Sequence, residues 1–361
     1  MKTLKNFLLV GLILVISSCN KEELFAPIEE QTLEETSKTN IKYNIDPLTI
    51  SLEKKAIPFR PASQNGTVNF KGQLWSIANS PDISHDPTDE AIIEAQIRSS
   101  SNGRDWTIRA RNPFEASIRY SLVVFDGKMW KIGGFAIDSD TDTALGATYY
   151  TSDGINWHFA SNSNLPHLYV DQAIVFNNKI YVFGGLFTPY TTSSDEPVIY
   201  SSSDGINWTL EASDALDTNL ASAIVFNNNI YLMNAFEPNS YNLGEIWQSA
   251  DGRNWSKVRR GLTKYPSTST GFPNRWGSGK VVYNNKVWLI GGSIDGTKTN
   301  DIWFTKDMKN WFQYTGDSKF APVTGLSALN FRDKIWLLGG YGSISQFNQI
   351  WSVKEKKLRF W

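Results

Sequence analysis

The chain has very few of the residues that form disulfides and metal centres. Its 361 residues include one cysteine, Cys19, and three histidines, His85, His158 and His167. A single cysteine excludes an internal disulfide, so we expect an apolar core to supply the stability. The histidines lack the spacing of a metal-binding motif, and the sequence contains no phosphate-binding loop. The sequence therefore predicts no metal or nucleotide cofactor.

An excess of positive charge is also missing. Lys2 and Lys5 precede Cys19, so 33 of the 35 Lys and Arg residues remain after it, against 36 Asp and Glu. No basic run interrupts this near-neutral balance. Proteins that bind nucleic acid usually present a basic face. We therefore expect no nucleic-acid partner.

Long apolar runs are absent except for one near the N-terminus, from Phe7 to Ile16. A membrane-spanning helix needs about 20 apolar residues, so this run is too short to cross a bilayer. Lys2 and Lys5 precede the run and small residues follow it, which is typical of a secretory signal. We therefore predict that residues 1–18 are a signal peptide.

The sequence Ile16-Ser17-Ser18-Cys19 resembles the bacterial lipobox. That resemblance implies lipid attachment at Cys19, where each buried CH₂ of the acyl chains contributes about 0.8 kcal/mol of membrane affinity. The following Asn20-Lys21-Glu22-Glu23 resembles the signal that sends some Gram-negative lipoproteins to the outside of the outer membrane. The two motifs imply an outer-membrane lipoprotein displayed on the cell surface, with a periplasmic orientation as the alternative. Membrane contact is expected through the lipid alone.

Residues 19–64 are predicted to form a tether. From Leu24 to Gln64 the chain is rich in Glu, Thr, Lys and Pro and shows no sustained period of 2 or 3.6. Two stretches depart from this composition, Leu48 to Leu52 and Ile57 to Arg60. Each is a candidate for a short strand at the edge of the folded body.

Aromatic residues, by contrast, are abundant, at 13% of the chain with 14 Trp. An aromatic residue is followed by a second one five positions later in six places, each separated from the next by 48 to 57 residues. The turn between the two is mostly Asn, Asp or Gly, which accept the positive φ of tight hairpins. The pairs are Phe70/Trp75, Phe125/Trp130, Phe176/Tyr181, Phe226/Tyr231, Tyr283/Trp288 and Phe331/Trp336. Six repeats, each beginning with a β-hairpin, are therefore predicted.

Two further features complete the repeat. Gly-Gly follows four of the second aromatics, and a motif of the form Ser/Thr-x-Asp/Asn-x-x-x-Trp occurs five times. The polar members of that motif are Asn102, Asp153, Asp204, Asp251 and Asp307. We predict that they are turn residues whose side chains accept backbone N–H bonds, with no catalytic role. A second hairpin at this motif makes each repeat a four-stranded meander.

The repeat of paired aromatics, Gly-Gly and a distal Trp resembles the kelch family, including its galactose-oxidase-like propellers. The Ser-x-Asp-Gly-x-x-Trp hairpins resemble sialidase Asp boxes, with one residue fewer between Asp and Trp. The resemblance implies an all-β, six-bladed propeller with four antiparallel strands per blade over residues 65–361. The predicted blades are 65–112, 113–163, 164–213, 214–262, 270–317 and 320–361. The sixth lacks the second motif, so either Leu358 to Trp361 or a strand from before Thr67 is expected to close the ring.

The resemblance also raises enzyme activities that relate to this fold. Copper radical oxidases need a cysteine cross-linked to tyrosine, but the sole cysteine lies in the lipobox, so that activity is not expected. Propellers that isomerise sialic acid use acid and base groups near the channel, for which Asp171, Glu237 and Glu245 are the candidate counterparts. These three residues fall in no recognisable motif. A sugar-active enzyme of the sialic-acid epimerase/mutarotase or glycoside hydrolase type is therefore the alternative function.

In a four-stranded meander the short hairpin turns share one face, so the long loops lie on the other, where ligand contacts are expected. The longest connection, between Trp255 and Tyr283, contains Arg275 and Trp276. Aromatic rings together with Arg, Asn and Asp suit glycans. The sequence thus predicts a non-catalytic module that binds glycan or protein. The predicted contacts are Arg119, Tyr120, Asp171, Phe187, Tyr190, Asn219, Tyr241, Arg275, Trp276 and Tyr341.

Overall fold

The computed structural model describes the chain from residue 48 to residue 356, with gaps. The described residues are 48–55, 66–80, 94–136, 147–160, 163–166, 168–186, 197–213, 216, 222–233, 245–259, 275–294, 296–342 and 349–356. They belong to the larger of two compact units, Ile45–Trp361. The predicted signal peptide, Cys19 and most of the predicted tether lie outside them. Nothing among the described residues is a helix with the length and apolarity of a membrane span.

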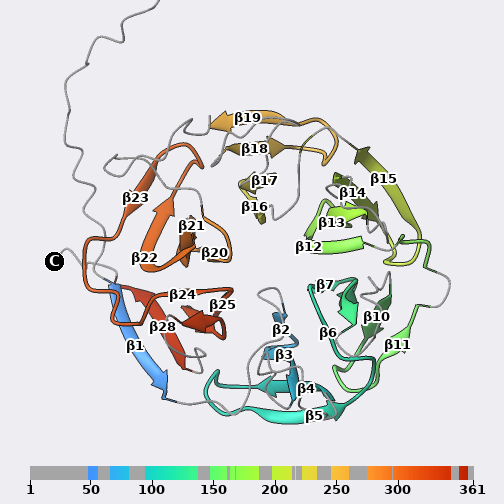
Figure 1. The fold of residues 1–361 in the computed structure, drawn as a ribbon, viewed down its shortest axis with the longest axis horizontal. Coiled ribbons are helices and arrows are strands. Elements are labelled where there is room, and N and C mark those ends of the chain that lie inside the picture. The colour runs from blue at the N-terminus through green and yellow to red at the C-terminus, as the bar shows by residue number, and fades with distance from the viewer. Residues whose placement is uncertain are drawn as a thin grey trace, which may run out of the picture. The chain divides into compact units, whose positions relative to one another are not determined.

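Six four-stranded antiparallel sheets form a ring, which confirms the predicted all-β, six-bladed propeller (Figure 1). Blade 1 contains β2 (Thr67–Phe70), β3 (Gln73–Ser80), β4 (Glu94–Ser100) and β5 (Thr107–Arg111), and blade 2 contains β7 (Ser121–Phe125), β8 (Lys128–Ile132), β10 (Thr148–Thr151) and β11 (His158–Phe159). Blade 3 contains β12 (Leu168–Phe176), β13 (Lys179–Leu186), β14 (Pro197–Ser202) and β15 (Trp208–Ser213), and blade 4 contains β16 (Ser222–Phe226), β17 (Asn229–Met233), β18 (Ile246–Ser249) and β19 (Ser256–Arg259). Blade 5 contains β20 (Gly279–Tyr283), β21 (Lys286–Ile294), β22 (Thr297–Thr305) and β23 (Trp311–Gln313). Blade 6 contains β25 (Ser327–Phe331), β26 (Lys334–Leu338), β28 (Ile350–Glu355) and β1 (Leu48–Lys54).

Each blade begins with a tight hairpin, as predicted from the aromatic pairs. Both turn residues have positive φ, for example 44° at Asn177 and 56° at Asn178, which gives the twist that matches two paired strands. In four hairpins the indole N–H of the second aromatic donates to the carbonyl of the first, as Trp288 does to Tyr283 at 3.0 Å. The other three are Trp75 to Phe70, Trp130 to Phe125 and Trp336 to Phe331. The five-residue spacing therefore places the two aromatics where a side-chain hydrogen bond joins the two strands of the hairpin.

The Ser/Thr-x-Asp motif forms the outer turn of five blades. The Asp153 Oδ1 atom accepts the backbone N–H of Ile155 and of Asn156, each at 2.8 Å, and Oδ2 accepts the Asn156 side-chain amide at 2.7 Å. These bonds, led by those from Asn156, hold the pKa of Asp153 well below its usual range. Asp204, Asp251, Asp307 and Asn102 accept the same two backbone bonds. The predicted structural role of these side chains is confirmed.

These outer turns also pack against the neighbouring blade. Gly154 of blade 2 lies on the Trp75 ring of blade 1, and a Cβ atom built there would be 2.3 Å from that ring. The contact recurs between Gly252 of blade 4 and Tyr181 of blade 3. In blade 5 the corresponding residue is Met308, which is buried with a φ of 63°. The outer turn of one blade thereby covers the inner hairpin of the preceding one.

The ring is closed by the strand that precedes Thr67. β1 pairs antiparallel with β28, with Ile50 opposite Val353, and in Figure 1 the first strand lies beside the last one. Leu48 and Ile50 are buried in the core of blades 5 and 6. Of the two predicted closing strands, the structure shows the one that precedes Thr67. The other candidate, Leu358 to Trp361, lies outside the described residues. The propeller includes residues from Leu48 on, so the predicted boundary at residue 65 is too late.

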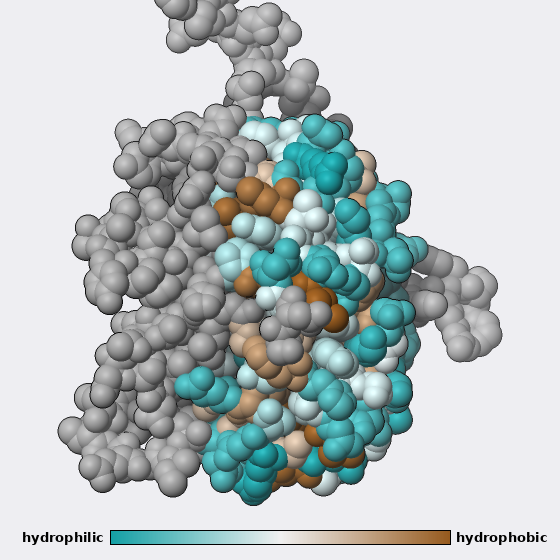
Figure 2. Space-filling model, turned by 90° about the vertical axis from the view of Figure 1, so that its right-hand side faces the viewer, coloured by the Kyte–Doolittle hydropathy of each residue, from teal (hydrophilic) through white to brown (hydrophobic). Residues whose placement is uncertain are grey.

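On the side of the ring drawn in Figure 2, the described residues are largely hydrophilic. Among the residues coloured in Figure 2, hydrophobic ones appear as separate spots between hydrophilic ones. Phe159 on β11 is 55% exposed and Leu210 on β15 is 47% exposed. Exposed apolar side chains of this scattered kind are normal on a soluble surface. The described residues on this side therefore form no continuous apolar patch in Figure 2.

Candidate functional site

Short bridges fix the backbone on the long-loop face of three blades. In blade 2, β6 (Ser117–Ile118) pairs with β9 (Phe135–Ala136), and in blade 6, β24 (Val323–Thr324) pairs with β27 (Tyr341–Gly342). In blade 5 a single bridge joins Trp276 to Ser293. Each bridge links the segment before the innermost strand either to the end of the second strand, as at Ser293 in blade 5, or to the segment after it, as in blades 2 and 6. We refer to these three pairings as the loop-side bridges.

A residue with left-handed backbone follows each loop-side bridge. Two of these residues are Gly277 and Gly325, with φ of 67° and 69°, and the third is Arg119, with φ of 51°. Glycine adopts this conformation without strain, whereas another residue pays roughly 1–2 kcal/mol. Backbone strain of this kind is concentrated at functional sites. Arg119 is exposed, and its place in a position suited to glycine keeps it among the candidate ligand contacts.

Two exposed aromatic side chains lie on neighbouring loop-side bridges. Trp276 is 51% exposed and Tyr341 is 48% exposed. Both flank Thr324, because its hydroxyl donates to the Trp276 carbonyl at 3.3 Å and it stands opposite Tyr341 in the β24–β27 ladder. The backbone N–H of Gly325 also donates to the Gly277 carbonyl at 2.6 Å. Blades 5 and 6 therefore hold these two rings on a fixed backbone, which we call the aromatic platform (Trp276 and Tyr341).

Arg275, the residue before Trp276, is buried next to the aromatic platform. Its side chain is 1% exposed and its guanidinium binds Asp301 with two bonds, Nη1 to Oδ1 at 2.5 Å and Nη2 to Oδ2 at 2.9 Å. Nη1 also donates to the Gly291 carbonyl at 3.0 Å. Burial alone would raise the pKa of Asp301, but Arg275 lowers it by hydrogen bonding and charge. Arg275 therefore anchors the segment next to Trp276, and its side chain is buried against Asp301 rather than displayed for the ligand contact predicted from the sequence.

Tyr120 is likewise a core residue. It is fully buried, and its hydroxyl donates to the Ile77 carbonyl at 3.1 Å. Its ring also forms one wall of a cage around the ammonium of Lys131, 5.0 Å from the ring centroid, with Phe114 at 5.1 Å and Tyr149 at 5.7 Å. The expectation that Tyr120 faces a ligand is wrong, because the adjoining blade covers it.

The remaining predicted contacts are not placed. Phe187, Tyr190, Asn219 and Tyr241 lie outside the described residues. Asp171 interrupts the β12–β13 ladder between Val170 and Gln172, and its side chain is also outside the described part. Of the predicted set, the structure thus brings together Trp276 and Tyr341, supported by Arg275, and places Arg119 on a similar bridge of blade 2.

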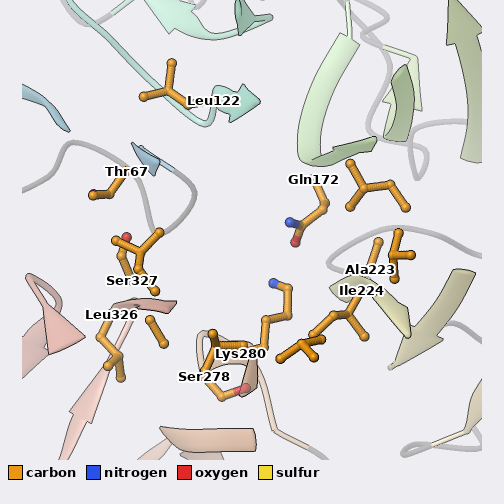
Figure 3. A pocket seen from close by; sticks show the side chains of 15 residues that line it. Thr67, Leu122, Gln172, Ala223, Ile224, Ser278, Lys280, Leu326 and Ser327 are labelled. Atoms are coloured by element: carbon orange, nitrogen blue, oxygen red, sulfur yellow. The ribbon is translucent and has the colours of Figure 1, made fainter. Parts of the chain in front are cut away.

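A cavity of about 260 Å³ lies between the innermost strands of the blades (Figure 3). Its polar lining residues are Thr67, Gln172, Ser278, Lys280 and Ser327. Among the described residues that line it, Lys280 is the one with a charged side chain. In Figure 3 the side chains of Lys280 and Gln172 point toward each other across the cavity. The centre of the ring thus combines a cation with amide and hydroxyl groups.

Two acidic groups near the long-loop face, Glu245 and Asp301, are paired with cations. Glu245 is buried, accepts a bond from Lys257 Nζ at 2.8 Å and one from the Trp247 indole at 3.0 Å. Asp301 holds Arg275, and Glu237 lies outside the described residues. In the part of the chain that the structure describes, no group of three His, Cys, Asp or Glu side chains is arranged to hold a metal.

Comparison with known proteins supports the propeller. A family profile described as the DUF6242 beta propeller domain matches residues 151–264. This stretch is similar to that propeller family. It covers blades 3 and 4 and the end of blade 2, less than half of the chain. No curated protein matches the chain.

Sequence reasoning missed Lys131 and Lys280, although the aligned repeats contain a signal for both. Lys131 directly follows the second aromatic of its hairpin, a place held by Val182, Leu232, Leu289 and Leu337 in four other repeats. Lys280 stands three residues before the first aromatic of its hairpin, where three other repeats have Ala173, Ala223 and Ala328. A charged residue at a position where the other repeats have mostly apolar ones indicates that this position is not ordinary core packing.

Proposed function

We propose that this chain is a lipoprotein anchored through Cys19 whose kelch-like propeller is a non-catalytic binding module for glycan or protein. The aromatic platform is the observation that supports this most. Trp276 and Tyr341 are each about half exposed, yet loop-side bridges hold their backbones in place. Aromatic side chains with little freedom left to lose are the usual anchors of binding sites.

The chemistry of the platform suits a sugar best. A pyranose offers apolar C–H faces that stack on aromatic rings, together with hydroxyls that bind polar protein groups around those rings. The Tyr341 hydroxyl and the exposed Arg119 supply such polar groups on the same face of the ring. A flat protein surface is the second ligand class that two neighbouring rings accept.

The enzyme alternative has less support. Glycoside hydrolysis needs two carboxyl groups about 5 to 9.5 Å apart in one pocket. Near the long-loop face, the described carboxylates of Asp301 and Glu245 instead form ion pairs with Arg275 and Lys257. The binding function therefore accounts for more of the described geometry than a hydrolase or an epimerase does.

A glycan array followed by titration of any bound sugar tests the proposal. We expect Trp276→Ala and Tyr341→Ala each to weaken binding by at least about tenfold, or roughly 1.4 kcal/mol. Phe159→Ala is the matched control, because it removes an exposed aromatic from the rim. Equal losses in all three variants would contradict the platform. Conversion of a bound sugar into a product would place the protein among the enzymes, and failure to bind any glycan would leave protein as the ligand class.

A further inference from the structure

Lys298 lies on the hairpin that borders the aromatic platform. β21 and β22 of blade 5 have nine residues each, against five and four in the matching strands β8 and β10 of blade 2. The ends of β21 and β22 on the long-loop face pair Ser293 with Lys298. The same Ser293 forms the loop-side bridge with Trp276. The backbones of Lys298 and Trp276 are thus held on either side of one residue.

The Lys298 side chain crosses to the other residue of the platform. Its Nζ donates to the Gly342 carbonyl of blade 6 at 2.7 Å, and Gly342 directly follows Tyr341. Thr324 stands opposite Tyr341 and donates to the Trp276 carbonyl at 3.3 Å. These contacts form a closed circuit through the platform, so the ammonium lies at its edge, next to Tyr341.

The bond to Gly342 fixes the ammonium without neutralising it. A lysine ammonium has several N–H donors and a full positive charge, whereas a backbone carbonyl is a neutral acceptor. The Lys298 side chain is half-buried, and a charged donor that is already held in place loses little freedom when a ligand binds. An anionic group of a ligand that lies on the rings would therefore accept a charge-assisted bond from Lys298.

The aligned repeats show that this lysine is particular to blade 5. It stands five residues before Trp303, the aromatic that precedes the outer-turn motif. The corresponding residues of the other repeats are Arg98, Tyr149, Tyr200, Trp247 and Trp351, and five residues before them the chain has Ile93, Ala144, Asp195, Asn242 and Gln346. A cation therefore occupies this position in the blade that also bears Trp276.

We propose that the aromatic platform binds a glycan that contains hexuronate residues. The uronate ring stacks on Tyr341, and its carboxylate, which projects from the edge of the sugar ring, accepts a bond from Lys298. Trp276 contacts the same glycan chain. This inference rests on the proposed function, because it names the class of glycan that the platform takes. A neutral glycan would use the rings alone.

The test uses short fragments of polygalacturonate, polymannuronate and hyaluronan, each as the free acid and as its methyl ester. Esterification removes the negative charge and keeps the sugar ring. The affinities are measured by calorimetric titration of the purified protein at constant ionic strength. We expect at least one acid to bind more tightly than its ester by about tenfold or more, the ratio that a hydrogen bond to a charged group gives.

Substitutions separate the cation from the rings. Lys298→Gln should bring the affinities of the acid and its ester together, because the carboxylate loses its charged donor. Lys309→Gln makes the same change of charge at an exposed lysine in the outer turn of the same blade, and it should leave the preference for the acid intact. Trp276→Ala should weaken the binding of both forms by about tenfold, because it removes stacking surface.

The outcomes distinguish this inference from the proposed function. Equal binding of acid and ester by the parent protein, or a preference for the acid that survives Lys298→Gln, overturns the inference and leaves the platform as a site for neutral glycans. Binding of neutral glycans on the array without binding of any uronate fragment has the same consequence. Failure to bind any glycan overturns the inference together with the glycan arm of the proposed function. Melting curves show whether each variant is folded, and the comparison of acid with ester in the parent protein decides the matter if Lys298→Gln is not.

Discussion

At the scale of single residues, Lys131 shows the effect of burial on a charge. Its side chain is 1% exposed between blades 1 and 2, and Nζ donates to the Gly133 carbonyl at 2.8 Å. Burial lowers the pKa of Lys131 to about 7, and the charge of Glu115 only partly opposes this. The aromatic cage compensates in part, because ring faces attract a cation. A charge at this position therefore costs stability whenever the lysine is protonated.

The stability of the protein should depend on pH through this lysine. An unfolded lysine has a pKa of about 10.4, so between pH 7 and 10 the unfolded chain binds more protons than the folded one. The free energy of unfolding contributed by Lys131 should therefore rise with pH across this window. Burial also raises the pKa of Tyr120 and of Tyr149, which face the ammonium, so neither titrates below pH 10.

Urea unfolding at pH 7, 8, 9 and 10 measures the effect. Lys131→Met should remove the rise and stabilise the protein at pH 7, because no charge is then buried. Lys128→Met is the control, since Lys128 is a partly exposed residue of the same strand. Equal slopes in the two variants would show that Lys131 does not titrate in this range.

At the scale of elements, β1 acts as the missing outer strand of blade 6. Glu53 on β1 has a side chain that is 3% exposed, and it accepts bonds from Ser352 at 2.6 Å and from Lys334 at 2.9 Å. It also pairs with Arg104 in the outer turn of blade 1. Glu211 on the outer strand of blade 3 has the same set of partners, Ser201, Lys179 and Arg253. β1 therefore reproduces the contacts of an ordinary outer strand.

Acid should weaken this closure. Burial alone would raise the pKa of Glu53, but the bonds from Ser352, Lys334 and Arg104 lower it to about 2. Its contribution to stability is then complete above the ordinary pKa, near 4.5, and is lost as the pH falls toward 2. Glu53→Gln should reduce the free energy of unfolding at pH 7 by about 1–3 kcal/mol, with a much smaller reduction at pH 2, where part of Glu53 is already protonated in the folded protein.

Chemical unfolding at the two pH values distinguishes this from a general surface effect. Asp105→Asn removes the charge of the exposed ion pair with Lys54 and keeps an oxygen that can accept the bond from the Asn102 amide. Exposed ion pairs contribute less than about 1 kcal/mol. A loss in Asp105→Asn as large as that in Glu53→Gln would mean that burial of Glu53 is not what matters.

Local patterns predicted most of these elements. The aromatic spacing and the Asn-Asn turns specify hairpins within a few residues, so all six inner hairpins and the outer turns were foreseen. The sequence did not decide which strand closes the ring. β1 and β28 are about 300 residues apart, and no local sequence pattern reports that pairing. Burial at the candidate site could not be predicted for the same reason. Arg275 and Tyr120 are covered by Asp301 and by the adjoining blade, which sequence spacing does not place.

At the scale of the whole molecule, the predicted anchor leads to a direct test. Cys19→Ala should abolish incorporation of labelled fatty acid and release the protein from the membrane fraction, because the acyl chains supply the membrane affinity. Ser18→Ala is the control, since a small residue remains before the cysteine. Fatty-acid labelling that persists in Cys19→Ala would contradict the lipobox interpretation. Protease treatment of intact cells then separates the two orientations, because only a surface-displayed propeller is cleaved.

The pairing of β1 with β28 also imposes an order of events on the newly made chain. Of the described strands, β1 leaves the ribosome first and its partner β28 last, so about 300 residues must be synthesised between them before the pair can form. Contacts of such high sequence separation form slowly, and unpaired strand edges invite association with other chains. A chain truncated before residue 350 would keep β1 without its partner. Completion of the ring thus reports that the chain has been made through β28.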